Sequence, residues 1–145
     1  MSFYNAEELF QKGSGGNAAM TTRDSSTCAV SLSPPSTGRV SAVIGFIFGV
    51  SVLQALRWSK GDYLTPEFDG YVIRWRRVAD RSKYKYALKL SHPGSQFSEH
   101  GKVQLTLGDP SMPLAGIKRR VPVTDVAYTI DDVGVIIDLS RFKNH

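Results

Sequence analysis

The side chains best suited to chemistry gather in one short stretch, which holds His92, Glu99 and His100. Imidazole nitrogens and carboxylates ligate zinc, and they also serve as acid and base catalysts. Two histidines eight residues apart with one carboxylate have no recognised zinc spacing, and histidines satisfied on the surface are the commoner case. The sequence therefore predicts no metal site and no cofactor.

The other reactive residue types have structural explanations. The single cysteine, Cys28, excludes an internal disulfide and stands in a Ser/Thr-rich stretch, where we expect a passive thiol. Most aspartates fall at the ends of predicted strands, where they form turns. Because the chain has no nucleophile elbow, phosphate loop or zinc pattern, we expect a protein that is not an enzyme.

Basic residues recur at alternate positions and indicate a site for an anion. Strand residues two apart share a face, so neighbouring strands would make one face of a sheet nearly all positive. The chain also carries a net charge of +5. The predicted anion-binding or partner-binding residues are Arg74, Arg76, Lys83, Lys85, Lys89 and Lys102.

This basic face has two interpretations. The cations can simply solvate a sheet and prevent aggregation at its edges. Alternatively they bind phosphates, those of anionic lipid or, as a weaker hypothesis, those of nucleic acid. The aromatic residues of these strands fall on the apolar side of the alternation, which disfavours a surface on which bases stack. They are Tyr71, Trp75, Tyr84 and Tyr86.

The alternation predicts the elements that would position these residues. About five short strands follow one another without a long helical pattern between them, which is typical of an antiparallel barrel or sandwich. The segments 91–101 and 109–120 are the long loops, where binding residues are expected. The expected strands are 71–78, 83–90, 102–107, 121–130 and 133–139.

An apolar run, Val40–Leu56, carries no charged residue and is bounded by Arg39 and Arg57. A helix here would be about 26 Å long, close to the roughly 30 Å of a bilayer core. The run starts too far into the chain for a secretory signal. The sequence therefore predicts a transmembrane helix over residues 40–58, and the alternative is a buried helix in the core of a soluble domain.

Within that helix, small residues would form one stripe. Ser41, Gly45 and Gly49 are spaced by four, which allows close approach of a second membrane helix. We take these three as candidate helix-association residues, acting in self-association or with other membrane subunits.

The predicted fold class is a membrane-anchored α+β protein with one transmembrane helix and a small antiparallel β domain. Residues 1–13 would form a short amphipathic helix, because they have capping residues at both ends. Residues 14–39 would be a flexible linker rich in Ser, Gly and Pro, and residues 59–145 would be the basic β domain.

The function expected from these features is that of a non-enzymatic single-pass membrane protein. Its basic β domain would act as a binding or assembly module in a membrane-associated complex, with the lipid bilayer as one partner. The distribution of basic residues slightly favours a cytoplasmic β domain. The alternative is a soluble basic β protein that binds nucleic acid, with residues 40–56 as a core helix.

Overall fold

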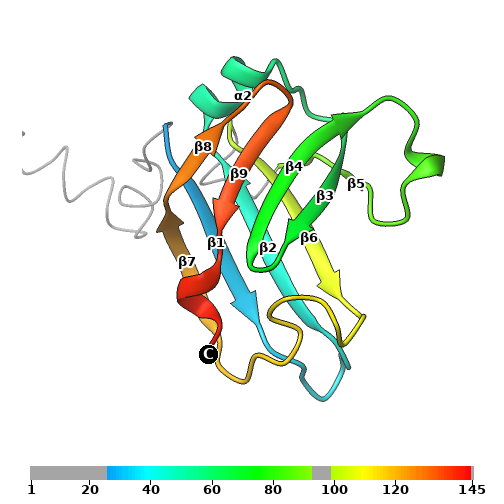
Figure 1. Ribbon diagram of the computed structural model, residues 1–145, viewed down its shortest axis with the longest axis vertical. Helices are drawn as coiled ribbons and strands as arrows, with labels where there is room; N and C mark the ends of the chain where they lie inside the picture. Colours follow the sequence, from blue (N-terminus) through cyan, green and yellow to red (C-terminus); the bar gives the residue numbers. More distant parts are fainter. Residues whose placement is uncertain (1–25, 93–98, 145) are drawn as a thin grey trace, which may run out of the picture.

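Alternating apolar residues build two antiparallel sheets, packed face to face in a sandwich (Figure 1). A computed structural model describes residues 26–92 and 99–144. The strands are β1 Cys28–Ser33, β2 Ala42–Phe48, β3 Tyr63–Asp69, β4 Val72–Val78, β5 Leu88–Lys89, β6 Gly101–Leu107, β7 Val121–Val126, β8 Tyr128–Ile130 and β9 Gly134–Asp138. The helical elements are α2 Val50–Leu56 and the short 3₁₀ helices η3 Arg81–Lys83 and η5 Ser140–Phe142.

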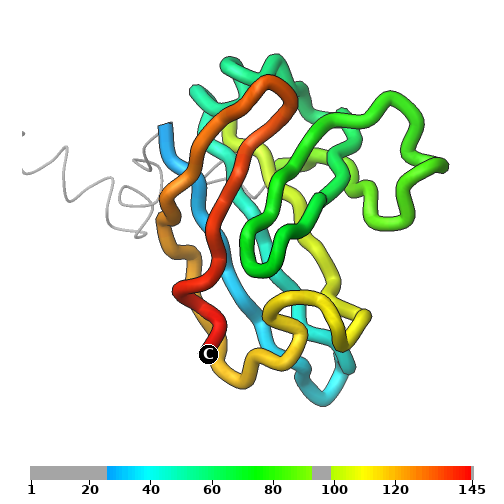
Figure 2. The backbone as a smooth tube through the Cα atoms, in the orientation of Figure 1, coloured from blue at the N-terminus to red at the C-terminus, as the bar shows by residue number. Residues whose placement is uncertain are grey.

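The two sheets are connected in different ways on the two sides of the sandwich. One sheet runs β6-β2-β1-β7 and the other β5-β3-β4-β9-β8. On one side β7 leads through Ala127 directly into β8, so a single stretch of chain borders both sheets (Figure 2). On the other side, within the described residues, an isolated antiparallel bridge between Ser91 and Lys102 links them.

The core lies between the sheets and is built from the inward rows of their central strands. The Phe46 and Trp75 rings meet across the sandwich edge to face, with centroids 5.2 Å apart. Burying each such side chain contributes about 1.5–3 kcal/mol. The other fully buried large residues include Phe48, Leu32, Ile44, Leu64, Ile73, Leu90, Leu105 and Ile137.

The predicted membrane helix is not formed, and this prediction is wrong. Its residues divide between β2 and α2, which are separated by Gly49. No helix within 26–92 and 99–144 has both the length and the apolar character needed to cross a bilayer. The predictions of a membrane-anchored α+β fold and of a single-pass membrane protein are corrected with it, because the described chain is mostly antiparallel β structure.

The physical reason lies in the position of β2 at the middle of its sheet. It pairs with β1 on one side and β6 on the other. Its inward residues are in the core, and its outward residues Val43 and Ile47 are only 6% and 5% exposed. A strand buried on both faces gives an unbroken apolar run, which periodicity alone cannot distinguish from a helix.

The run then turns into a helix of only seven residues, α2. It ends at Arg57, whose φ of 58° is left-handed and whose N–H reaches the carbonyls of Leu53 and Gln54. Trp58 follows and packs edge to face on Phe48, 5.7 Å between centroids. Trp58 is therefore a core residue.

Two further segments differ from the prediction. Residues 28–33, assigned to the linker, form β1. Of the predicted strand 83–90, only Leu88–Lys89 is a strand, while η3 and turns occupy most of the rest. The predicted helix over residues 1–13 lies outside the described residues.

Candidate functional site

Two arginines of β4 carry the outward charge predicted for this strand, and both are ion-paired. Glu67 of β3 stands opposite Arg74 in the register. Its carboxylate accepts from Arg74 Nε at 2.8 Å and from Arg76 Nε at 2.9 Å. These contacts, the one from Arg76 first, hold the pKa of Glu67 below its ordinary value. The positive charge of this face is thus largely neutralised within the protein.

Asp131, in the turn between β8 and β9, forms a second ion pair with Arg74. Its Oδ2 lies 2.8 Å from Arg74 Nη1, while its Oδ1 accepts from the backbone N–H groups of Val133 and Gly134. The backbone bond from Val133 and then the arginine lower the pKa of Asp131. The carboxylate therefore serves the turn and the ion pair together.

A second set of cations lies on residues 79–89, here called the basic loop, which projects to the side of the sandwich (Figure 1). Asp80 opens η3 by accepting from the Ser82 N–H at 3.0 Å. Tyr84 ties the loop to β4, since its hydroxyl accepts from Arg76 Nη2 at 3.3 Å. The loop therefore has a defined backbone, although only its last two residues, Leu88–Lys89, form a strand.

The cations of the basic loop form no salt bridge in the part of the chain that the structure describes, where the salt bridges involve Arg74, Arg76 and Arg77. Two of them lie over aromatic rings: Arg81 over Tyr63 at 5.1 Å, and Lys85 over Tyr86 at 5.3 Å. Such contacts attract the cation to the ring face without neutralising its charge. The four cations are Arg81, Lys83, Lys85 and Lys89.

A groove of about 590 Å³ separates the basic loop from β6. Across it, Lys85 contributes to lowering the pKa of Asp109, although the hydrogen bonds from Ser111 are the larger causes. The two walls are thus within electrostatic reach. The groove is lined by Lys85, Tyr86, Leu88, Gln104, Leu105, Thr106, Gly108, Asp109 and Pro110.

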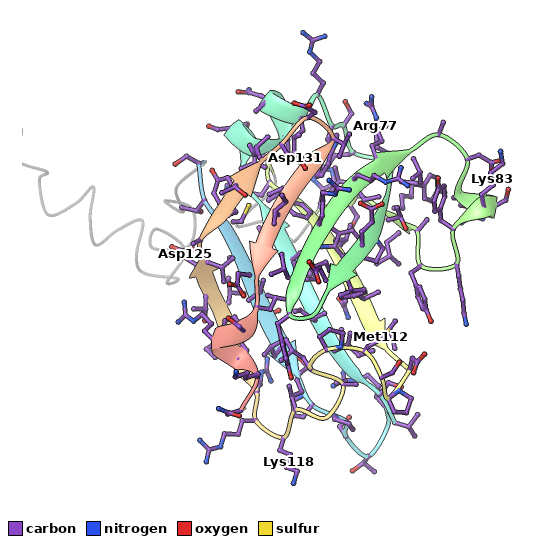
Figure 3. All side chains as sticks on the ribbon, in the orientation of Figure 1. Arg77, Lys83, Met112, Lys118, Asp125 and Asp131 are labelled. Carbon is purple, nitrogen blue, oxygen red and sulfur yellow. The ribbon has the colours of Figure 1, made fainter. Side chains whose placement is uncertain are left out.

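The six predicted anion-binding residues do not share one sheet face. Arg74 and Arg76 lie together on β4, in the five-stranded sheet, whereas Lys102 belongs to β6 of the other sheet. Lys83 and Lys85 are on the basic loop, where Figure 3 places Lys83 away from the sheets, and Lys89 is on the short strand β5. The structure therefore separates the paired arginines of β4 from the four lysines, among which Lys85 lines the groove.

The predicted helix-association residues do not share a helix face either. Ser41 precedes β2, Gly45 lies within β2 and Gly49 caps α2. The side chains of Ser31 and Lys102 lie directly over Gly45. A Cβ at Gly45 would lie 2.9 Å from Ser31 Oγ and 3.4 Å from Lys102 Cε. The absence of a side chain at Gly45 therefore leaves room for these two side chains on the outward face of the sheet.

The two histidines lie in different surroundings. His100 is buried, and His92 Nδ1 lies 3.5 Å from Lys60 Nζ. Over 26–92 and 99–144, no three His, Cys, Asp or Glu side chains are grouped so as to hold a metal. Cys28 is fully buried in the core, and this burial raises the pKa of its thiol to about 12, which disfavours the reactive thiolate.

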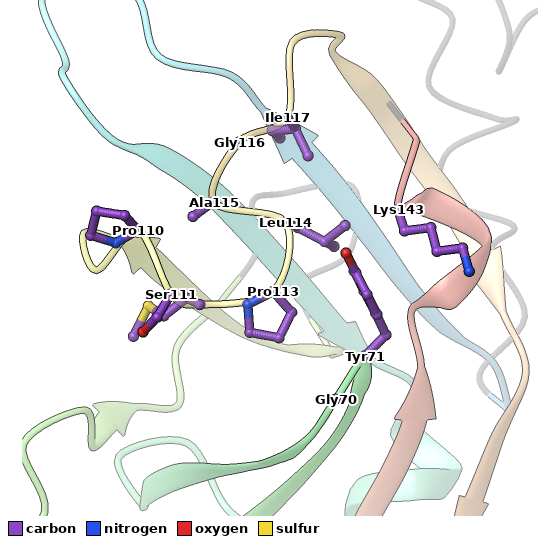
Figure 4. A pocket seen from close by; sticks show the side chains of 11 residues that line it. Gly70, Tyr71, Pro110, Ser111, Pro113, Leu114, Ala115, Gly116, Ile117 and Lys143 are labelled. Atoms are coloured by element: carbon purple, nitrogen blue, oxygen red, sulfur yellow. The ribbon is translucent and has the colours of Figure 1, made fainter.

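A second hollow, of about 470 Å³, lies between the β3–β4 turn and the loop before β7. Figure 4 shows the Tyr71 side chain extending toward Leu114, with Lys143 on the far side. Leu114 adopts a left-handed φ of 66° in a turn closed by the Ala115 N–H and the Met112 carbonyl. The lining contains no histidine or carboxylate, so it offers no acid–base pair.

Comparison of the chain with protein-family models, with curated proteins and with solved structures finds no match. Function must therefore be argued from the groove and the basic loop. Sequence reasoning missed the groove residues on β6, Gln104 and Thr106. Their alternation was visible, but the position of their strand at the edge of a sheet was not.

Proposed function

We propose that this protein is a non-enzymatic binding module that docks an acidic protein partner on its basic loop. The observation that carries the proposal is the contrast in charge pairing. The arginines on β4 are held by Glu67 and Asp131. The loop cations, among them Lys83 and Lys85, form no salt bridge within the described residues, and Lys85 interacts with Asp109 across the groove without one.

The titrating groups support binding rather than catalysis. The lowered pKa values of Asp80 and Asp109 come first from hydrogen bonds with the serine two residues on, which are turn contacts. Glu67 and Asp131 have lowered pKa values in ion pairs and turns, away from the neutral range that a general base needs. Burial raises the pKa of the Cys28 thiol to about 12, so the reactive thiolate is disfavoured.

A protein partner fits better than nucleic acid because the rings near the cations are already engaged. Nucleic-acid surfaces of this kind stack bases on exposed aromatic faces. Here Arg76 lies over the Tyr84 ring at 5.2 Å, Arg81 covers Tyr63, and Trp75 is fully buried. The groove beside the loop has apolar residues in its lining, Leu88 and Leu105, which suit polypeptide side chains.

The test is a titration of the full chain with poly-L-glutamate over a range of salt concentrations. Reversing two loop charges, Lys83→Glu with Lys85→Glu, should weaken binding at least tenfold and flatten its salt dependence. The matched control reverses two exposed charges elsewhere, Lys118→Glu with Arg119→Glu. Lys118 lies well apart from Lys83 in Figure 3.

The control variant should retain the affinity of the natural chain. An equal loss in both variants would mean that net charge alone drives binding, and the proposal would fall. A parallel titration with single-stranded polyadenylate covers the rival function. Tighter binding of polyadenylate, lost with the same loop charges, would replace the acidic protein by nucleic acid.

A further inference from the structure

Strand β6 is the outermost strand of its sheet, and the hydrogen bonds of Lys102 reveal how its edge is oriented. The Lys102 N–H bonds the Ser91 carbonyl at 2.8 Å, and the Ser91 N–H bonds the Lys102 carbonyl at 3.0 Å. The backbone groups of Lys102 therefore point away from β2. In an antiparallel ladder these directions alternate, so Gln104 and Thr106 point the same way. The register of β6 with β2 is unbroken over this stretch.

The segment before β6 pairs with the open edge of β6 at one residue, Ser91, and the residues before Ser91 pair with the other sheet instead. The Leu90 N–H bonds the Asp62 carbonyl at 2.8 Å, and β5 pairs with β3 of the other sheet. Within 26–92 and 99–144, no backbone group bonds Gln104 or Thr106 on the side away from β2. Both residues instead line the groove beside the basic loop.

The groove thus joins an open backbone edge to an apolar wall. Leu105, inward on β6, is 2% exposed, and Leu88 and Tyr86 face it from the basic loop. Strand edges with unpaired N–H and C=O groups are templates for a further strand. The lining holds one basic residue, Lys85, and one acidic residue, Asp109. Lys83 and Lys89 of the basic loop add positive charge nearby, while the Lys102 side chain lies on the outward face of the sheet, over Gly45 of β2.

We propose that this groove binds an extended peptide, which adds to β6 as an antiparallel strand and alternates apolar with acidic residues. The inference rests on the proposed function, and it specifies the conformation of the partner. Residues paired across a ladder lie on the same face. The peptide residues that hydrogen-bond Gln104 and Thr106 are therefore the outward, acidic ones, while the apolar ones face Leu88 and Leu105.

This geometry allows a test that compares two methylated peptides of the same charge and the same amino-acid composition. The probe is an eight-residue peptide of alternating valine and glutamate with blocked ends, titrated against the full chain. N-methylation of every glutamate removes the N–H groups that face β6, and it should weaken binding at least tenfold. N-methylation of every valine alters groups that point away from β6, and it should leave the affinity within about threefold.

A protein variant tests the same contact from the other side. Gln104→Pro removes the edge N–H without touching the ladder to β2, and edge strands tolerate proline. It should weaken binding of the unmodified peptide at least tenfold, whereas Gln104→Ala, which keeps the N–H, should not. Circular dichroism verifies that both variants are folded, and the Lys102 and Ser91 amides report whether the bridge survives.

Equal binding of the two methylated peptides, with both still sensitive to Lys83→Glu and Lys85→Glu, would overturn strand addition and leave the proposed function standing. Methylation-sensitive binding that ignores those two charge reversals would support the strand and overturn the role of the basic loop. No detectable binding of the unmodified peptide at millimolar concentration would overturn the strand proposal, and the polyglutamate titration would then judge the loop separately.

Discussion

Strand β4 and the basic loop carry the same kind of sequence, with cations alternating with apolar or aromatic residues, yet they differ in structure and in charge pairing. On β4, Ile73 and Trp75 are fully buried and the intervening arginines contact Glu67. On the loop, Tyr84 and Tyr86 are only partly buried, and Lys83 and Lys85 are exposed. One segment contributes to the core, and the other presents charge.

The difference lies in the neighbours. Strand β4 is paired on both sides, with β3 and β9, so each outward side chain has a cross-strand partner. Among the described residues, the basic loop has such a partner only at Leu88 and Lys89, which pair with β3. Alternation permits a strand, but ladder partners and an opposing sheet are what stabilise it. The same absence of partners leaves the loop cations available for binding.

The largest expected effect comes from breaking the pairing of β4. Gly134 of β9 lies opposite Arg76, and a Cβ there would lie 1.9 Å from the Trp75 carbonyl oxygen. Gly134→Ala should therefore force the strands apart and lower the free energy of unfolding by roughly 3 kcal/mol or more. Urea denaturation measures this.

The control for this variant is Gly116→Ala, where nothing lies within 4 Å of the added Cβ. It should leave stability within about 0.5 kcal/mol. An unchanged denaturation midpoint for Gly134→Ala would show that β4 and β9 are not in this register.

A medium effect is expected from the same charge reversal made in the two regions. Arg76→Glu would lose the contacts with Glu67 and Tyr84 and place two carboxylates together, which should cost roughly 2 kcal/mol of unfolding free energy. Lys85→Glu should change stability by less than about 0.5 kcal/mol. If thermal denaturation gives equal losses for both, the basic loop is part of the folded ion-pair network and the comparison fails.

The smallest effect concerns the pH dependence of the β3–β4 ion pairs. The pKa of Glu67 is lowered on folding, so its pairing stabilises the protein above the ordinary glutamate value of about 4.5 and is lost as pH falls through the lower folded-state pKa. Glu67 is partly solvated, so Glu67→Gln should cost less than about 1 kcal/mol at neutral pH.

The measurement is the unfolding free energy of both proteins between neutral and strongly acidic pH. The stability gap between the natural protein and Glu67→Gln should narrow as the solution becomes acidic. A gap that stays constant, or widens, would mean that the carboxylate does not gain its stability from the arginines.

Several strands were predictable because their alternation is regular and their ends carry turn residues. The predicted strands 71–78 and 102–107 correspond closely to β4 and β6. The predicted strand 121–130 is divided at Ala127, where the chain passes from one sheet to the other. Strand β3 was missed, and it supplies Glu67, the residue that neutralises the predicted basic face.

By itself the sequence determined which residues alternate, where turns form and that the chain is basic, because these depend on local backbone preferences and side-chain chemistry. Only the tertiary structure decided that Val40–Leu56 becomes a buried strand and a short helix, since burial on both faces is set by neighbouring strands. It also decided which cations are paired and which edge is open. These properties depend on register between distant segments, such as Glu67 with Arg74 and Ser91 with Lys102.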